Sequence, residues 1–300
     1  MAAVETRRFE SARGAAVREA LVGYGFVLLP MAIFIAFFIY PIGYAFYISF
    51  FDWGILGKFE SVGLDNYREL LHDELFRRAL KNTLYYTAGV VPAQMALGLL
   101  LAVTVNQAIR GRAFFRSAFY FPSLAGSAAI MAVALYLLSA DGLVNSILGI
   151  DQPWFGDSDT ALQSIMALNV WTTSGTIMLF YLASLQSIPT DVYEAAAIDG
   201  AKSWRTFWKI TFPLLKPGHF FVAVVSVIGC LKIFDQAYIA SGGTGGPNYS
   251  TLTAVLYLYR TLFSDFEFGY AAAAGIALFV IIFVVTAIQR LLFGKAEVGL

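Results

Sequence analysis

Long apolar stretches separated by short polar ones dominate the sequence. Crossing the hydrocarbon of a bilayer takes about 20 residues of α-helix. Six stretches reach that length, at residues 21–51, 84–105, 118–138, 161–185, 219–240 and 269–293. A shorter apolar stretch at residues 251–263 is expected at the outer face of the membrane. The pattern predicts an all-α polytopic membrane protein with six transmembrane helices.

An arginine-rich segment, residues 1–20, precedes the first apolar stretch. The stretch is too long for the apolar core of a signal peptide, and no small-residue cleavage site ends it. We therefore expect an uncleaved first span, bent at Pro30 and Pro41 because proline disrupts helical hydrogen bonding. Arginines beside a span favour the cytoplasmic side, so residues 1–20 are predicted to form a cytoplasmic N-terminal segment.

The positions of lysine and arginine predict which loops face the cytoplasm. With the N-terminus inside, thirteen of the 20 basic residues lie on the cytoplasmic side, six lie outside, and Lys232 lies within a span. Cytoplasmic loops carry the excess of positive charge, so this asymmetry supports six spans with both termini cytoplasmic. Residues 188–217 then form a cytoplasmic loop, and residues 52–81, 139–160 and 241–267 form outer loops.

Composition and motifs exclude several classes of function. Hydrophobic residues make up 59% of the chain and charged residues 13%, with a formal net charge of zero, so nothing indicates a nucleic-acid partner. One cysteine and two distant histidines form neither a disulfide nor a Cys/His metal cluster. The Gly-Lys pairs at residues 57–58 and 294–295 lack the rest of a P-loop, and no HExxH or GxSxG motif is present. Neither ATP binding nor intramembrane hydrolysis is therefore expected of this chain.

A long polar segment between two spans, residues 191–217, has the pattern of two short helices. Asp191 and Glu194 resemble a capping box, and Gly200 can supply the left-handed residue that ends a helix, which predicts a first helix over residues 192–199. A second, amphipathic pattern follows and is expected to stop at Pro213. The segment is therefore predicted to form two helices that meet at a glycine.

The same segment resembles the EAA loop of the membrane subunits of bacterial ABC importers. The matching positions are Glu194, Ala195, Ala196, Gly200, Ile210 and Pro213, with Phe212 where leucine is usual. Residues 63–83, GLDNYRELLHDELFRRALKNT, also resemble the sugar-importer branch, which includes maltose, trehalose and glycerol-phosphate importers. The resemblance covers nearly the whole chain. It implies the type I permease fold, with residues 21–300 as the permease domain.

This resemblance implies that the loop docks onto a separate ATPase subunit. The residues expected to couple the two subunits are Glu194, Ala195, Ala196, Asp199, Gly200, Ala201, Ile210 and Pro213. Small side chains let the backbone of a partner come close, and a carboxylate can meet a cationic partner residue. The alternative is an amphipathic helix lying at the membrane interface, anchored by its two tryptophans.

The resemblance also implies the other components of a complex. A separate ATPase dimer would bind ATP and Mg²⁺, an extracytoplasmic solute-binding protein would deliver the substrate, and a second, non-identical permease subunit would complete the pathway, although a homodimer stays open. No cofactor or metal is expected in this chain itself. The complex would lie in a bacterial or archaeal cell membrane, among its lipids. The expected substrate is a disaccharide or oligosaccharide, with glycerol-phosphate or another polar solute as the alternative.

Polar side chains in the fourth predicted span are candidates for the substrate pathway. Asn169, Trp171 and Thr172 combine an amide, an aromatic face and a hydroxyl. A sugar needs hydrogen-bonding groups for its hydroxyls and an apolar surface for its C–H face. Packing of small polar residues between spans is the alternative.

The fifth predicted span carries two charges, Lys232 and Asp235, followed by Gln236. Charged side chains within a bilayer are functional by default, so these three are predicted to line the pathway or an outer gate. A local ion pair between the two charges is the alternative. An ion-coupled secondary transporter is a further hypothesis, for which Asp235 is the one candidate coupling residue. Weaker pathway candidates are Gln94, Tyr85, Tyr86 and Tyr136.

Overall fold

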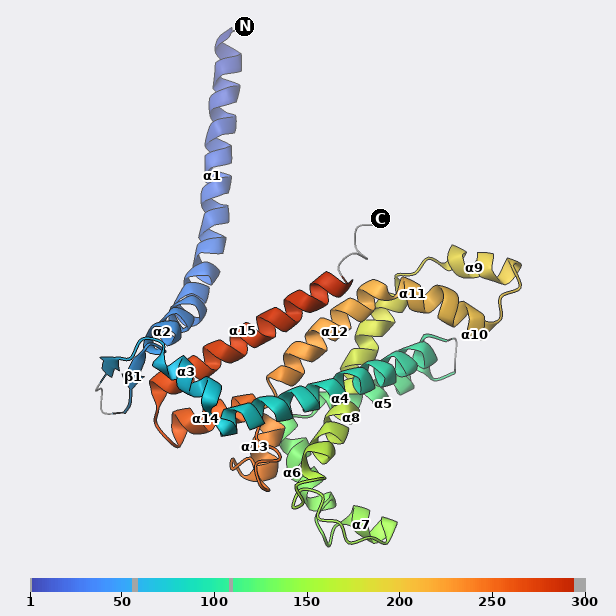
Figure 1. Cartoon of the computed structure of the whole chain (residues 1–300). Helices are drawn as coiled ribbons and strands as arrows, with labels where there is room; N and C mark the ends of the chain where they lie inside the picture. The colour runs from blue at the N-terminus through green and yellow to red at the C-terminus, as the bar shows by residue number, and fades with distance from the viewer. Residues whose placement is uncertain (1, 56–58, 108–109, 294–300) are drawn as a thin grey trace.

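The computed structural model describes residues 2–55, 59–107 and 110–293 (Figure 1). Both Gly-Lys pairs considered above lie outside the described residues. Among the described residues, five helices are long and apolar enough to cross a membrane, and two shorter helices bent against each other make up a sixth crossing. The prediction of an all-α protein with six spans is therefore confirmed.

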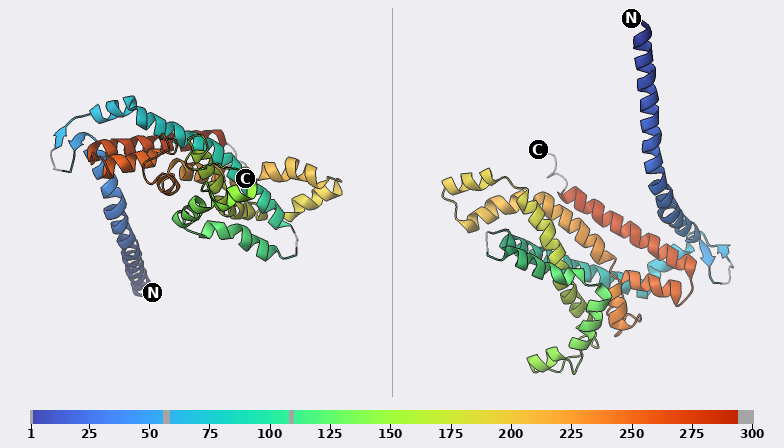
Figure 2. Two further views of the ribbon diagram at one scale, coloured as in Figure 1. Left: turned by 90° about the horizontal axis from the view of Figure 1, so that it is seen from below. Right: turned by 180° about the vertical axis from the view of Figure 1, so that it is seen from behind.

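The first span is one continuous helix made of α1 (Ala2–Phe34), a π-helical turn η1 (Ile35–Ile39) and α2 (Tyr40–Ile48). Pro30 leaves α1 uninterrupted, whereas the π-turn lies immediately before Pro41. Because a proline ring clashes with the carbonyl of the preceding turn, the wider π-turn makes room for it. None of the apolar part of this helix is buried, and α1 stands apart from the other spans (Figures 1 and 2).

The first predicted outer loop contains a short antiparallel hairpin, which no pattern in the sequence predicted. Its strands are β1 (Phe51–Trp53) and β2 (Phe59–Ser61). The amphipathic helix expected within residues 63–83 is present as α3 (Asp65–His72), and α4 (Glu74–Asn106) follows at once. The second spanning helix therefore begins well before residue 84, where the apolar stretch starts.

The third span is broken, so the prediction of one continuous helix over residues 118–138 is wrong. α5 (Arg112–Leu124) and α6 (Ser127–Leu137) are bent by 90° against each other. Ala125 and Gly126 between them have extended backbones, with ψ angles of 140° and 137°. Apolar residues flank the break on both sides, so the hydropathy of the chain carries no sign of it.

α8 (Ala161–Gln186) packs between α4 and α5 at the centre of the molecule. A Cβ atom at Gly98 of α4 would lie 2.5 Å from Cγ2 of Ile177, and one at Gly175 of α8 would lie 2.4 Å from the carbonyl oxygen of Phe119. Glycines at the crossing points thus let these helices approach closely, as is common between transmembrane helices.

The fifth span is also interrupted. α12 (Lys216–Leu231) ends three residues before α13 (Asp235–Ser241) begins, so a continuous helix over residues 219–240 is not observed. The carbonyl of Ile233, within the interruption, accepts a hydrogen bond of 3.0 Å from Thr253 Oγ1. Thr253 caps the next helix, α14 (Ala254–Phe263), so the break is tied to a residue outside the span.

α14 matches the short apolar stretch predicted at residues 251–263, and α15 (Phe268–Phe293) is the last span. α13, α14 and the small helix α7 (Leu143–Leu148) lie at one end of the helical bundle. The loop of residues 188–217 and the end of α15 lie at the opposite end (Figures 1 and 2). The spans thus place the predicted cytoplasmic loop opposite the predicted outer loops.

Candidate functional site

The polar loop between the fourth and fifth spans begins with α9 (Thr190–Ile198), which ends at Gly200 with a φ angle of +70°. The Ala201 N–H donates to the Ala196 carbonyl and the Gly200 N–H to the Ala197 carbonyl, both at 3.0 Å. This pair of bonds is a Schellman motif, which closes a helix around a left-handed residue. The predicted role of Gly200 is therefore confirmed.

The predicted capping role of Asp191 is wrong. Pro189 occupies the N-cap position of α9, and no side chain caps the helix. Asp191 lies instead within the first turn, where a negative charge still favours the positive end of the helix dipole. The helix starts earlier than predicted because Pro189 leads directly into it with its fixed φ angle.

The second arm of the loop continues past Pro213, where the sequence analysis expected it to stop. α10 (Ser203–Thr206) runs through a π-turn, η2 (Phe207–Thr211), into α11 (Phe212–Leu214). The Phe212 N–H donates to the Phe207 carbonyl across five residues, so the π-turn lies immediately before Pro213 as η1 does before Pro41. A wider turn again accommodates the proline, so the helix is not ended by it.

The predicted coupling residues are mostly on the surface of this loop. Glu194, Ala195, Asp199, Gly200 and Pro213 are exposed, Ala201 and Ile210 are half-buried, and Ala196 is buried. Beside them, Ile198 is 86% exposed and Trp204 75% exposed. Large apolar side chains that the chain itself leaves uncovered mark a surface that binds a partner or a membrane.

The loop is attached to the spans through its inner face. Tyr193 and Phe207 pack against the buried cluster formed by α4, α8 and α12. Thr211 Oγ1 donates to Tyr193 Oη at 3.3 Å, which joins the two arms of the loop. The ring of Phe212 lies 4.5 Å from that of His219 on α12. A series of direct contacts therefore runs from α9 through the second arm of the loop to α12.

A polar cavity of about 390 Å³ lies between α4, α8, α12 and α13. It brings together four of the predicted pathway residues, which are Asn169, Lys232, Asp235 and Gln236. Asn169 Nδ2 donates to Gln236 Oε1 at 3.2 Å across the two spans. The amide of Gln94, a weaker candidate in the sequence, accepts a bond of 2.7 Å from Thr173 Oγ1.

Two hydroxyl groups in this cavity have no hydrogen-bond partner within the described chain. They belong to Tyr86 and Ser226, and both side chains are buried. Buried hydroxyls are normally satisfied, so this pair is available to a polar substrate or to water. Tyr86 was a weaker candidate in the sequence and Ser226 was not a candidate. The signal for Ser226 was a hydroxyl within the mostly apolar first half of the fifth span.

The two charges of the fifth span do not form the local ion pair considered in the sequence analysis. In the part of the chain that the structure describes, the salt bridge within 4.0 Å is between Arg68 and Asp65. Lys232 follows the last residue of α12 and Asp235 is the first residue of α13, so the two do not share a helical face. Both side chains are exposed and line the cavity.

The structure separates Trp171 and Thr172 from this cavity. Trp171 is 54% exposed and lines a second cavity of about 510 Å³ that also contacts Trp154. Thr172 is buried, its hydroxyl donates to the Asn169 carbonyl of its own helix, and its carbonyl accepts a bond of 2.6 Å from Ser123 Oγ. The surroundings of Thr172 thus agree with the packing alternative. Tyr85 and Tyr136 are exposed and do not line the polar cavity.

A hydrogen-bonded network at the end of the bundle that carries the predicted outer loops joins α4, α14 and α15. The Asp73 carboxylate accepts bonds from the backbone N–H groups of Leu75 and Phe76 and from the hydroxyls of Tyr257 and Tyr270. Burial alone would raise the pKa of Asp73, but these hydrogen bonds together lower it. No pattern in the sequence pointed to this network, because its members lie almost 200 positions apart.

Glu267, at the start of α15, has the opposite shift. Burial raises the pKa of the Glu267 carboxyl, and the charges of Asp265 and Glu69 raise it further. Its ionised form is therefore disfavoured in the folded protein, unlike that of Asp73.

Comparison with known proteins identifies the family. Residues 94–297 match the family described as the binding-protein-dependent transport system inner membrane component. The chain belongs to this family. It is 36% identical to the probable ABC transporter permease protein YesP of Bacillus subtilis, over 90% of each chain. It is 34% identical to the multiple sugar-binding transport system permease protein MsmF of Streptococcus mutans, over 92% of this chain and 96% of MsmF.

A solved structure supports the fold. The chain superposes with a TM-score of 0.82 on a chain of a bacterial alginate ABC transporter in complex with an alginate pentasaccharide-bound periplasmic protein. The sequence identity is 22%, and 95% of this chain and 98% of that chain are covered. The fold is therefore that of an ABC importer permease. The protein is a multi-pass membrane component of a transporter, and not an enzyme.

Proposed function

We infer that this chain is the permease subunit of an ATP-driven importer and forms half of the translocation pathway for a sugar. The polar cavity is the main support for this proposal. Amide and hydroxyl groups from three spans line it, and it includes residues on both sides of the break between α12 and α13. Such groups suit the hydroxyls of a sugar, and broken helices are typical of transport sites. The relatives MsmF and the arabinooligosaccharides transport permease AraP, 36% identical over 87% of this chain, are named for sugar transport.

The loop of residues 188–217 supplies the coupling to a separate ATPase dimer, which binds ATP and Mg²⁺. Glu194 and the small residues that follow it form the docking surface, with Gly200 setting the angle between the two arms. ATP-driven closure of the ATPase would move α9, and the Tyr193–Thr211 and Phe212–His219 contacts would carry the movement into α12. In this arrangement the loop and both termini are cytoplasmic, as the charge distribution predicts.

A neutral disaccharide or oligosaccharide is the preferred substrate. Lys232 is the one cationic side chain that lines the cavity, and Asp235 lies beside it, so the two charges offset each other. A phosphate group would need an excess of cationic donors, which argues against glycerol-phosphate. An extracytoplasmic binding protein would deliver the sugar to the outer end, and a second, non-identical permease subunit would close the other half of the pathway.

The proposal is tested by purifying the tagged chain from its native membrane in detergent and identifying what is bound to it. We expect an ATPase and a second permease in the eluate, and loss of the ATPase in Glu194→Arg. Asp151→Arg makes the same charge change in an exposed outer loop and should keep the ATPase. Uptake of labelled oligosaccharide and of glycerol-phosphate into proteoliposomes then separates the two substrates. Recovery of this chain alone, with uptake driven by an ion gradient, would contradict the proposal.

A further inference from the structure

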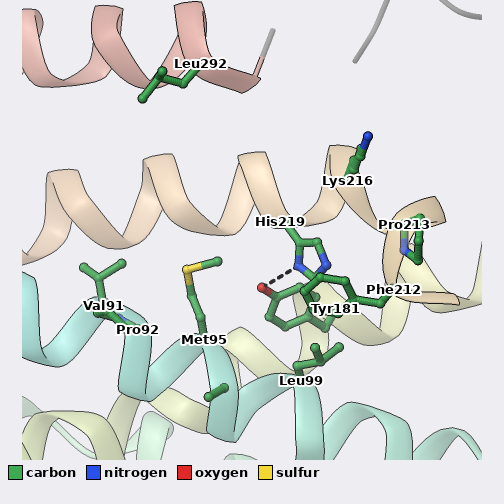
Figure 3. Close-up of a pocket in the computed structure, with 11 residues that line it drawn as sticks. Val91, Pro92, Met95, Leu99, Tyr181, Phe212, Pro213, Lys216, His219 and Leu292 are labelled. Carbon is green, nitrogen blue, oxygen red and sulfur yellow. Dashed lines mark hydrogen bonds between the residues drawn. The ribbon is translucent and has the colours of Figure 1, made fainter. Parts of the chain in front are cut away.

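A large apolar groove lies near the coupling loop, away from the polar cavity. It has a volume of about 950 Å³ and runs between α4, α12 and the end of α15 (Figure 3). Val91, Met95 and Leu99 of α4 line one side, and Leu292 of α15 approaches from the other (Figure 3). We call it the inner groove. The inner groove takes no part in the proposed coupling to the ATPase or in the proposed sugar pathway.

The inner groove is open to its surroundings. Pro92 and Ala96 are exposed on α4, and Leu292 is 73% exposed. Most of its wall belongs to helices that are long and apolar enough to cross a membrane, so the groove lies at the depth of the bilayer. Apolar cavities do not hold water stably, and an empty groove loses dispersion contacts along its whole lining. The groove therefore requires an apolar occupant.

One end of the inner groove is polar. Lys216, the first residue of α12, is exposed there beside Pro213 (Figure 3). It forms no salt bridge with the residues that the structure describes. Deeper in the groove, the Tyr181 hydroxyl and His219 Nδ1 are joined at 3.0 Å, so these groups are committed to each other. The free charge thus lies where the spanning helix begins, at the level of lipid headgroups.

We propose that the inner groove binds an anionic phospholipid, with an acyl chain along α4 and the phosphate beside Lys216. The apolar lining of the groove suits a hydrocarbon chain, and the lysine at its end, which has no salt bridge among the described residues, complements a phosphate. The assignment to the cytoplasmic leaflet rests on the proposed orientation of the chain. Phe212 and Pro213 form part of the wall, so the lipid contacts the segment that leads from the coupling loop into α12.

The test is native mass spectrometry of the whole importer, reconstituted with phosphatidylglycerol and phosphatidylcholine and then partly delipidated. The unmodified importer should retain phosphatidylglycerol in preference. Lys216→Gln should weaken that retention about fivefold, the effect of one basic residue near an anionic headgroup. Ala96→Phe should reduce retention of both lipids, since its side chain fills the groove. Lys81→Gln at the other end of α4 and Ala20→Phe on the exposed first span are matched controls and should change neither.

A photoreactive phenylalanine in place of Leu292, whose side chain is 73% exposed at the edge of the inner groove, identifies the occupant without filling the groove. Cross-links to phospholipid support the proposal, whereas cross-links to a second permease subunit would show that protein fills the groove and would overturn it. Equal lipid retention by Lys216→Gln and Lys81→Gln would overturn it as well. These measurements count lipids and need no transported sugar, so they fail or succeed independently of the proposed substrate.

Discussion

Gly200 allows a sharp test of how the coupling loop works. Its φ angle of +70° is one that residues with a Cβ atom rarely adopt. A Cβ atom built at this position meets nothing within 4 Å. Replacement by a larger residue therefore acts on the backbone of the loop and not through a clash within this chain.

The expected size of the effect follows from that geometry. Holding an L-residue in the left-handed region costs about 1–2 kcal/mol. Gly200→Ala should therefore reduce the population of the observed loop conformation, relative to others, roughly 5–30-fold. Asparagine tolerates this region better than alanine does, and a β-branched residue tolerates it worse. We therefore expect damage to increase from Gly200→Asn to Gly200→Ala to Gly200→Val, which is not the order of side-chain volume.

The assay is the number of sugar molecules transported for each ATP hydrolysed, measured in proteoliposomes that contain the whole importer. Gly149→Ala is the matched control, since Gly149 has a φ angle of +67°, also meets nothing within 4 Å, and ends α7 at the opposite end of the bundle from α9 (Figure 1). It should lose a similar amount of local stability while leaving the coupling ratio unchanged. If Gly200→Ala and Gly149→Ala give the same ratio, or if Gly200→Asn is more damaging than Gly200→Ala, the reasoning is refuted.

Three further predictions concern packing, charge and the polar cavity. Gly175→Ala should lower the free energy of unfolding by about 1–3 kcal/mol, because the new methyl group meets the backbone of α5. Gly25→Ala on α1 is the control, because its methyl group meets nothing. Thermal unfolding in detergent measures the difference, and equal midpoints for the two variants would contradict the prediction. Asp73→Ala should lower the free energy of unfolding by about 0.5–2 kcal/mol through loss of the helix cap alone. Because the pKa of Asp73 is lowered in the folded protein, this loss should persist at neutral pH and shrink only as the pH falls below about 4. Glu267→Gln should instead raise the unfolding midpoint at neutral pH, because the pKa of Glu267 is raised, and this gain should disappear on acidification. Gln236→Leu should raise the KM for sugar while the ATPase stays bound, because it removes the bond to Asn169 in the cavity. Thr172→Val should leave uptake intact, because the Thr172 hydroxyl bonds within its own helix. Loss of uptake in Thr172→Val with a normal KM in Gln236→Leu would indicate a pathway closer to α5.

Much of the candidate site could be predicted because its signals are local in the chain. Gly200 follows directly on the helix that it ends, so its role is visible in a short piece of sequence. The spacing from Glu194 to Pro213 is likewise a property of the sequence and does not depend on how the spans pack. The details of the helix ends were less predictable. The predictions for Asp191 and Pro213 were both wrong, because α9 starts at Thr190, before Asp191, and the second arm continues past Pro213 through a π-turn.

The residues that line the polar cavity were predicted only in part. Asn169 and Gln236 meet across 67 positions, while the neighbours of Asn169 at 171 and 172 face other surroundings. Polarity identifies candidates within a span, but the direction of each side chain depends on how the spans pack. Tyr86 and Ser226 illustrate the converse, since their importance comes from burial without a partner, which composition cannot reveal.

The sequence by itself determined that the chain is a six-span membrane protein, and it predicts which side each loop faces and where a partner docks. These properties follow from mean hydropathy, charge bias and short-range spacing, all of which are sums over neighbouring residues. Only the tertiary structure decided where the third and fifth spans break, which side chains share a cavity, and that an apolar groove ends at Lys216. Those features depend on contacts such as Thr253 with Ile233 and Gly175 with Phe119, between residues that the fold alone brings together.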